Sequence, residues 1–198
     1  MNSSCLICGV GGQGVVLASR LIASAAMDEG LFVRTAETIG MAQRGGSVVS
    51  HVRWGSDIHS PLIPFGGADV VLALEPAEAV RSLHYLKEGG AVITSSKVIK
   101  PVTASLSGGY DGGAMLNYLK THIDKLFIVD TDAVCKAAGS HKAANIALLG
   151  AAAASGALSF SLEQIEKAIH AQTREKFFDT NQKALQLGAA AVNGGNQI

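Results

Sequence analysis

Short apolar runs and stretches of helical spacing alternate along the chain. Apolar runs of about four to eight residues are typical of buried strands, and apolar residues recurring at helical spacing are typical of helices. Strands alternating with helices predict a three-layer α/β/α fold with a mixed, mostly parallel sheet. The expected strands are 4–9, 31–36, 47–54, 68–74, 91–94 and 125–130, and the expected helices are 13–29, 76–86, 131–138, 142–154 and 162–172, with a mostly helical stretch to about 187.

The connections refine this picture. The first strand, helix and second strand form a Rossmann-like βαβ unit, but no helix fits between the strands 31–36 and 47–54, so these two are not joined by a standard parallel crossover. Gly89 and Gly90 are expected to end a helix, and the stretch 95–113, with Pro101 and several glycines, is expected to be irregular. We expect one domain over 1–192 and a frayed tail over 193–198.

One uncharged stretch, 143–162, is long enough in principle to cross a bilayer. It consists mostly of small residues, however, and its end carries the start of a new helix. Ser161 and Gln164 have the spacing of a capping box, and Phe160 and Ile165 occupy the staple positions around it. We therefore expect two helices here and no membrane span.

The charge balance bounds the class of protein. The chain has 198 residues with 16 Lys and Arg against 16 Asp and Glu, so the basic excess typical of nucleic-acid binding is missing. Three cysteines and the absence of a leader-like start indicate a cytoplasmic protein. Charged residues make up only 16% of the chain against about 25% in a typical domain, which favours a surface partly covered by another chain; an Ala- and Gly-rich, tightly packed monomer is the alternative.

A glycine turn between the first strand and the first helix is the first candidate site. Gly9, Gly11 and Gly14 match G-x-G-x-x-G in the strand–turn–helix context that an anion site requires. Glu37, at the end of the second strand, would be the acidic residue of a dinucleotide site. The turn thus permits NAD, flavin or CoA phosphates, and a tight turn without ligand is equally open.

A second candidate is the loop GMAQRGG at 40–46. Arg44 beside Gly45 and Gly46 could project a bidentate guanidinium toward a ligand or partner, or it could simply anchor a surface turn.

Other kinds of catalytic or metal site are excluded or only weakly indicated by the sequence. Cys5 and Cys8 lie in one strand at positions that face opposite ways, and with Cys135 they are too few for a four-thiolate iron–sulfur cluster. The six histidines show no metal-ligand pairing, and no G-x-S-x-G elbow occurs. Lys142 and Asn145 could form a polar pair in a cleft, but an ordinary helix face is the favoured interpretation.

These motifs together carry a resemblance that covers nearly the whole chain. The sequence is similar to the gamma-type domain of the 2-oxoacid:ferredoxin oxidoreductases, and the string GMAQRGGSVVSHVR is most similar to the small (beta) subunits of the indolepyruvate branch. The matching segments are GVGGQG, ETIGMAQRGGSVVSHVRWG, SPLI, ADVVLALEPAEAVRSLHYLKEGG and KAANIALLGA.

The resemblance implies a non-catalytic subunit of an enzyme complex. Such complexes convert a 2-oxoacid, CoA and oxidised ferredoxin to acyl-CoA, carbon dioxide and reduced ferredoxin, with thiamine diphosphate and iron–sulfur clusters on a large partner subunit. This chain would bind no cofactor tightly, be inactive alone and help to close the CoA side of the site; self-association is a further interaction to test. The residues expected there are Gly9, Gly11, Gly12, Gln13, Gly14, Gln43, Arg44, Gly45 and Gly46.

Two other functions stay open at this point. One is a self-sufficient NAD-dependent dehydrogenase that uses the turn from Gly9 to Gly14 with Glu37. The other is a purely structural interaction module with an empty turn. Binding of NAD to the isolated chain would favour the first, and co-purification with a large iron–sulfur partner would favour the oxidoreductase subunit.

Overall fold

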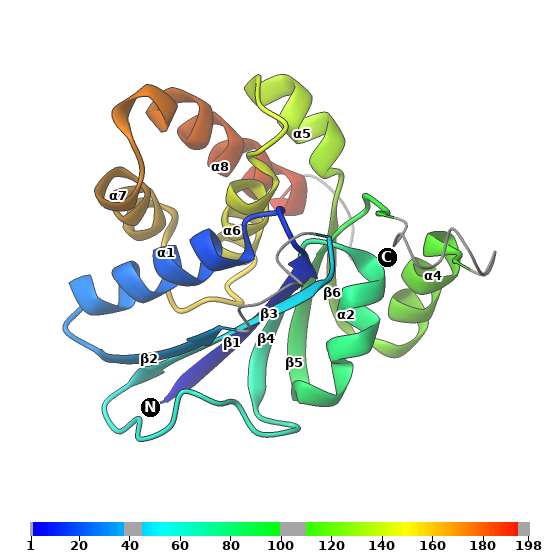
Figure 1. Cartoon of the computed structure of the whole chain (residues 1–198), viewed down its shortest axis with the longest axis horizontal. Helices are drawn as coiled ribbons and strands as arrows, with labels where there is room; N and C mark the ends of the chain where they lie inside the picture. Colours follow the sequence, from blue (N-terminus) through cyan, green and yellow to red (C-terminus); the bar gives the residue numbers. More distant parts are fainter. Residues whose placement is uncertain (1, 38–44, 100–109, 194–198) are drawn as a thin grey trace.

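The fold is a six-stranded mixed sheet with helices on both faces (Figure 1). The computed structural model describes residues 2–37, 45–99 and 110–193. The strands are β1 (Ser3–Val10), β2 (Phe32–Glu37), β3 (Ser47–Gly55), β4 (Ala68–Ala73), β5 (Leu86–Ser95) and β6 (Lys125–Val129). The helices are α1 (Val15–Asp28), α2 (Pro76–Ser82), α4 (Gly112–His122), α5 (Thr131–Ala138), α6 (Ala144–Ala154), α7 (Leu162–Gln172) and α8 (Phe178–Asn193), with 3-10 turns at Leu83–Tyr85 and Glu175–Phe177.

The strand order is β2-β3-β1-β4-β5-β6. Strands β1, β4, β5 and β6 pair in parallel, whereas β3 is antiparallel to both of its neighbours. The expected mixed, mostly parallel sheet is therefore confirmed, including the absence of a helical crossover between β2 and β3. The first βαβ unit is Rossmann-like in direction, but β3 is inserted between its two strands.

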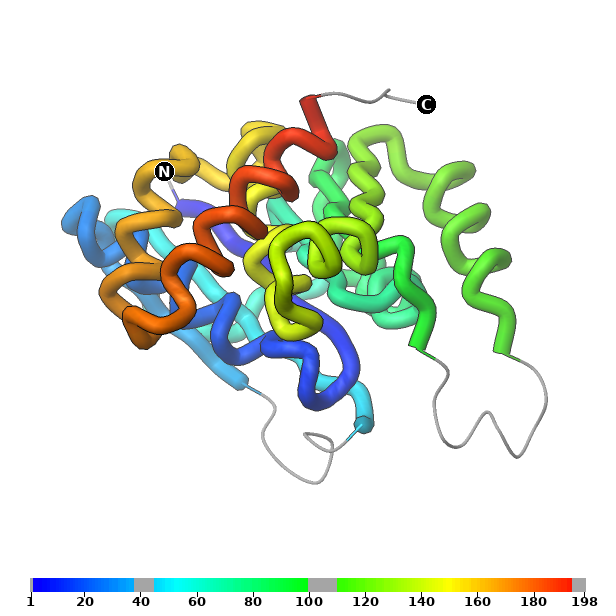
Figure 2. Tube along the Cα trace, turned by 90° about the horizontal axis from the view of Figure 1, so that it is seen from above, coloured from blue at the N-terminus to red at the C-terminus, as the bar shows by residue number. Residues whose placement is uncertain are grey.

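The two faces of the sheet carry separate cores. Alternation along β1 sends Cys5 and Ile7 to the larger core under α1, α5, α6, α7 and α8, and Leu6 and Cys8 to the smaller core under α2 and α4. The opposite orientation of Cys5 and Cys8 expected from their spacing is thus confirmed. Figure 2 shows α8 running along α6, the helix pair with the most extensive contact in the larger core.

The helix starts follow from local chemistry. Ser161 caps α7 through the expected capping box: its Oγ accepts from Gln164 N at 3.3 Å, and its own N–H donates to Gln164 Oε1 at 2.8 Å. Phe160 and Ile165 are both buried beside it. The uncharged stretch therefore divides into α6 and α7, as expected, and no helix of the described ranges has the length and apolar character that spanning a bilayer requires.

Two expectations were wrong. Gly89 and Gly90 do not end a helix: they lie inside β5, where Gly89 has φ of 68° beside a register irregularity in the β4–β5 pairing. The helix before them ends at Ser82, because the chain turns through a 3-10 segment and re-enters the sheet at Leu86.

Helix α4 was not expected at all. Its first two residues, Gly112 and Gly113, have poor helix propensity, and the sequence pattern places them in the irregular stretch 95–113. Asp111 compensates, since its carboxylate accepts from Gly113 N and Ala114 N at 2.9 and 3.1 Å. Residues 100–109 of that stretch and 194–198 of the expected tail lie outside the described residues.

Several boundaries also differ. Helix α1 begins at Val15 and not at 13, because Gly14 adopts a left-handed conformation with φ of 90°. Helix α6 begins at Ala144, so Lys142 lies before the helix and forms no pair with Asn145 on a helix face. Helix α8 continues beyond 187 to Asn193.

Candidate functional site at the carboxyl edge of the sheet

The glycine turn lies where the sheet changes its direction of winding. After β1 the chain crosses to α1 on one face, and after β4 it crosses to α2 on the other. Strands β1 and β4 are parallel neighbours, so their carboxyl ends meet here. In open α/β sheets this point is the usual location of a ligand crevice.

The turn brings the two expected segments together. Gly12 and Gly14 have φ of 98° and 90°, conformations that favour glycine. Gly11 N donates to Gly46 O at 2.8 Å, so the end of the second loop lies against the turn. Gly45 has φ of 89° and continues that loop, whereas Gln43 and Arg44 lie outside the described residues.

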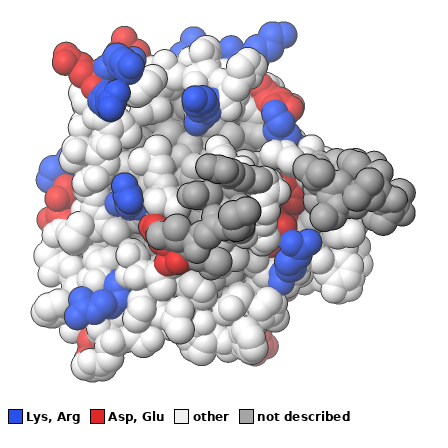
Figure 3. Space-filling model, viewed as in Figure 1, with Lys and Arg blue, Asp and Glu red and all other residues white. Residues whose placement is uncertain are grey.

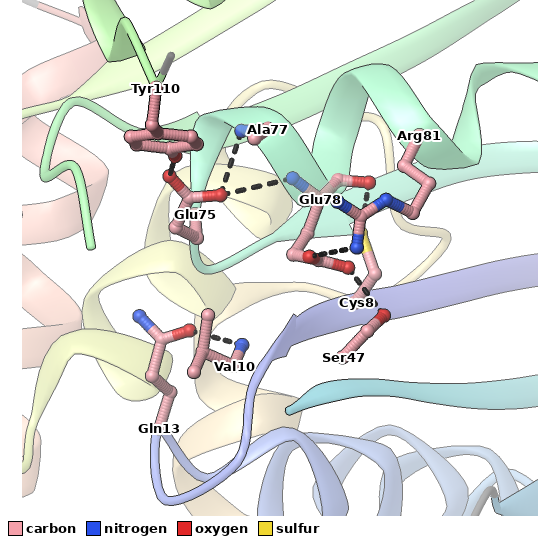
Figure 4. Close-up of polar contacts among 9 residues, drawn as sticks. All are labelled: Cys8, Val10, Gln13, Ser47, Glu75, Ala77, Glu78, Arg81 and Tyr110. Atoms are coloured by element: carbon pink, nitrogen blue, oxygen red, sulfur yellow. Dashed lines mark hydrogen bonds and ion pairs between the residues drawn. The ribbon is translucent and has the colours of Figure 1, made fainter. Parts of the chain in front are cut away.

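Gln13 ties the turn to the neighbouring strand. Its Oε1 accepts from Val10 N at 2.6 Å (Figure 4). Its Nε2 donates to Leu74 O at 2.9 Å. A Cβ on Gly9 would lie 2.9 Å from that Oε1 and 3.1 Å from Leu74 Cβ, so Gly9 provides room for the Gln13 side chain. Both polar ends of Gln13 are thus engaged within the protein, and Gly9 serves packing.

Asn145 supports the turn from the other side, and sequence reasoning missed this role. Its Nδ2 donates to Gly14 O at 3.2 Å, and its Oδ1 accepts from Ile146 N at 2.9 Å. A Cβ on Gly14 would lie 2.6 Å from the Asn145 Nδ2. Since the two residues are 131 positions apart, only the tertiary fold brings them together.

A hollow of about 300 Å³ opens beside the turn. Helix α1 begins at its wall, with no side chain capping the first turn and no acidic residue within it. Backbone N–H groups and the partial positive charge of a helix start favour an anion. The hollow is lined by Val10, Gly11, Gly12, Gly14, Val15, Val16 and Val48.

A network of buried carboxylates borders this edge, and it too was not anticipated. Glu75 is 1% exposed and caps α2 by accepting from Ala77 N and Glu78 N at 2.8 and 3.0 Å. The Tyr110 hydroxyl donates to the other carboxylate oxygen of Glu75 (Figure 4). The signal in the sequence was the Glu-Pro pair directly after the strand, which places a carboxylate at the N-cap before a Pro at the first helical position.

Glu78 forms the second half of the network. It accepts from Ser47 Oγ at 2.5 Å and pairs with Arg81 Nη1 at 2.7 Å (Figure 4). The Cys8 thiol donates to the Glu78 backbone carbonyl at 3.4 Å. The network therefore joins β1, β3 and α2 at the edge where the turn lies.

Burial and these carboxylates control the nearby titratable groups. Burial, followed by Glu75, raises the pKa of Tyr110, so its hydroxyl stays protonated as a hydrogen-bond donor. Burial raises the pKa of Cys8 to about 12, and it also raises the pKa of Cys5 and of Cys135. None of the three thiols has thiolate character at neutral pH, and no group of three or more metal-ligating side chains occurs among the described residues.

Glu37 is placed poorly for a dinucleotide. Because β3 separates β2 from β1, the end of β2 lies about 9–10 Å across the sheet from the glycine turn rather than beside it. The Glu37 carboxylate also accepts from Ser19 Oγ at 2.9 Å. The geometry argues against the NAD-dependent dehydrogenase.

Charge at this edge is modest. On the face drawn in Figure 3, Lys, Arg, Asp and Glu lie in small groups, several of them of mixed sign, and form no continuous patch of one sign among the described residues. This agrees with a formal net charge of zero. An anion in the hollow would thus be held by backbone N–H groups.

Comparisons with known proteins assign the family. The model of the pyruvate ferredoxin/flavodoxin oxidoreductase family matches residues 4–191. The indolepyruvate oxidoreductase subunit IorB of Archaeoglobus fulgidus is 42% identical over 190 residues, 95% of this chain and 94% of the relative. Its counterpart in Thermococcus kodakarensis is 37% identical over 192 residues, 94% of each chain.

A solved structure agrees. The gamma subunit of a keto/oxoacid ferredoxin oxidoreductase from Geobacter sulfurreducens PCA has a TM-score of 0.70 and 26% identity, covering 98% of this chain and 99% of that one. The resemblance stated from the sequence motifs is confirmed. The chain belongs to the pyruvate ferredoxin/flavodoxin oxidoreductase family over nearly its whole length.

Proposed function

We propose that this chain is the small subunit of an indolepyruvate ferredoxin oxidoreductase, with a larger subunit that carries the thiamine diphosphate and iron–sulfur clusters. The observation that carries the substrate class is the 42% identity to an indolepyruvate oxidoreductase subunit along 95% of the chain. The reaction takes a 2-oxoacid and CoA to acyl-CoA and carbon dioxide, and two electrons pass to ferredoxin. Thiamine diphosphate supplies the electron sink for decarboxylation.

The chain's own contribution is a corner on the CoA side of the complex. Gly11, Gly12 and Gly14 line the hollow, and the start of α1 offers backbone N–H groups to a phosphate. The carboxylates Glu75 and Glu78 do not line the hollow and are already engaged by neutral donors and by Arg81. Gln13 supports the turn through its hydrogen bonds to Val10 and Leu74, and Gly9 leaves room for the Gln13 side chain.

The loop 43–46 completes the proposed corner. Gly46 is hydrogen-bonded to Gly11, and Gln43, Arg44 and Gly45 directly precede Gly46 in the sequence. An arginine there would neutralise a CoA phosphate that the backbone alone holds weakly. This supports a role for Arg44 in CoA binding or in assembly with the larger subunit.

Reconstitution tests the proposal. The chain alone should show no turnover of aryl or alkyl 2-oxoacids, and co-expression with the larger subunit should give a complex that reduces ferredoxin with indolepyruvate and CoA. Turnover by the isolated chain, or binding of NAD to it, would contradict the proposal. If this chain binds the larger subunit but the larger subunit is fully active without it, this chain would be only a structural interaction module.

Two variants test the CoA corner in that complex. Gly12 has open space around a would-be Cβ, and Asn tolerates positive φ better than other residues, so Gly12→Asn should fold and raise the KM for CoA with kcat little changed. Arg44→Ala should raise the same KM or weaken assembly. Gly139→Asn is the matched control, since Gly139 has φ of 80° and open space at the end of α5. Unchanged CoA kinetics and assembly in both test variants would overturn this assignment.

A further inference from the structure

One end of the sheet is covered by helices on one face only. Helix α1 packs on β2 and β3 from the side of the larger core, while α2 and α4 lie toward β4 and β5 on the other side (Figure 1). No helix of the described ranges covers β2 and β3 on that second side. We call the residues there the arginine face: Phe32, Arg34, Arg53 and Leu62.

The register places these residues on one face. Val33 pairs with Trp54 and packs on the larger core, so the neighbouring pair Arg34 and Arg53 points to the opposite side. Phe32 lies two positions from Arg34 on the same side and is 62% exposed. Leu62, in the loop after β3, is 59% exposed and lies beside Arg53, whose Nη1 donates to its carbonyl at 3.2 Å.

The charges on this face are unbalanced. Arg34 and Arg53 are directly opposite each other across an antiparallel pair, an arrangement of like charges that destabilises a sheet. Arg34 Nη1 donates to the Val33 carbonyl at 3.1 Å, and neither guanidinium forms an ion pair with a carboxylate of the described residues.

Arg53 adds a buried donor without an acceptor. Its Nε is buried and has no hydrogen-bond partner, while its Nη1 is held by the Ser60 and Leu62 carbonyls. Asp57, in the same loop, is paired with His59 at 2.6 Å. The face therefore presents two guanidinium groups that have no carboxylate partner among the described residues, beside two exposed apolar side chains.

We propose that the arginine face docks an acidic segment of the larger subunit. Carboxylates would pair with both guanidinium groups and remove the repulsion between them. The exposed Phe32 and Leu62 favour a polypeptide over a small anion, because arginine and aromatic side chains together are typical of the centre of protein interfaces. The inference rests on the proposed function, which supplies the larger subunit.

The charge reversal Arg34→Glu tests this proposal in the complex. The affinity of this chain for the larger subunit, measured by biolayer interferometry, should fall about tenfold or more, because a carboxylate on the face repels the acidic segment. Added NaCl should weaken the wild-type complex more than the variant complex. In the isolated chain the same variant should melt at the same or a higher temperature, since the new carboxylate would lie opposite Arg53.

The controls separate docking from folding and from the proposed function. Arg20 is an exposed arginine of α1, which packs on the other side of the sheet, so Arg20→Glu should bind like the wild type. Phe32→Ser, which leaves both charges in place, should weaken binding without changing its salt dependence. If Arg34→Glu lowers the melting temperature, the neutral variant Arg34→Gln takes its place in the binding assay.

Three results would overturn the inference. An Arg34→Glu complex within about twofold of the wild-type affinity would do so while leaving the proposed function intact. If light scattering shows that Arg34→Glu changes the mass of the isolated chain relative to the wild type, the face would be assigned to contact with a second copy of the chain. A wild-type chain without affinity for the larger subunit would overturn both proposals.

Discussion

The two faces of the sheet differ in the polarity of their buried residues. Beneath α1, α6, α7 and α8 most of the buried residues are apolar, and α6 and α8 approach closely at Gly150 and Gly188. Beneath α2 and α4 the core is smaller, and buried Glu75, Glu78 and His51 lie beside it. The stability of the first face therefore depends on close packing. The stability of the second depends on whether each buried polar group has a hydrogen-bond partner.

The largest expected effect is on the apolar face, at the crossing of α6 and α8. A Cβ on Gly188 would lie 1.9 Å from the Ala147 carbonyl oxygen, so Gly188→Ala must separate the two helices. We expect the free energy of unfolding to fall by about 3 kcal/mol or more, measured by urea denaturation.

Gly113→Ala is the control for that variant. Gly113 lies exposed in the first turn of α4, where alanine favours the helix by up to about 1 kcal/mol. Equal stability of the two variants would show that the α6–α8 crossing is looser than the contact implies.

On the polar face the expected loss is smaller. Tyr110→Phe removes the hydroxyl donor to the buried Glu75 carboxylate, and we expect a loss of about 2 kcal/mol because a charged acceptor loses its partner. Tyr118→Phe is the matched control, since Tyr118 is exposed and its ring stacks on His122. A similar loss in both variants would contradict the role of Glu75.

A further effect on the polar face depends on pH. Burial lowers the pKa of His51 below its ordinary value of 6.5, and its Nδ1 accepts from Ile63 N at 3.2 Å as a neutral ring. The unfolded chain therefore takes up this proton at a higher pH than the folded chain. The contribution is present above about pH 6.5 and is lost as the pH falls through the folded pKa.

Denaturation at pH 8 and pH 5.5 measures this contribution. The wild type should lose more stability between these values than His51→Asn, whose amide oxygen can accept from Ile63 N at either pH. The comparison at pH 8, where the ring is neutral in both states, removes the packing difference between the variants. Parallel losses in the two proteins would show that His51 does not titrate on unfolding.

The smallest effect is expected for the thiols, which lie on both faces. Cys5 and Cys8 face opposite cores and Cys135 is buried in α5, so iodoacetamide at pH 8 should leave all three unmodified in the folded chain. Mass spectrometry should show three labels after guanidinium unfolding and one in folded Ser56→Cys, an exposed position. Rapid labelling of Cys8 alone would indicate that the polar face opens locally.

The family and the glycine turn could be predicted because their signals are local. The strand–turn–helix context of Gly9 to Gly14 and the capping box at Ser161 are each encoded within a few residues. The same locality misled at Gly89 and Gly90, which resemble a helix stop but form an irregular part of β5. Pairing with β4, and not propensity, decides their conformation.

The sequence by itself determined the alternation of strands and helices, the family and the opposite orientations of Cys5 and Cys8, because period and spacing act over short distances along the chain. Only the tertiary structure decided that Asn145 supports Gly14 and that Gly46 meets Gly11. It likewise set Arg34 opposite Arg53. Contacts between distant segments depend on the packing of whole elements, which the pattern of any one segment does not encode.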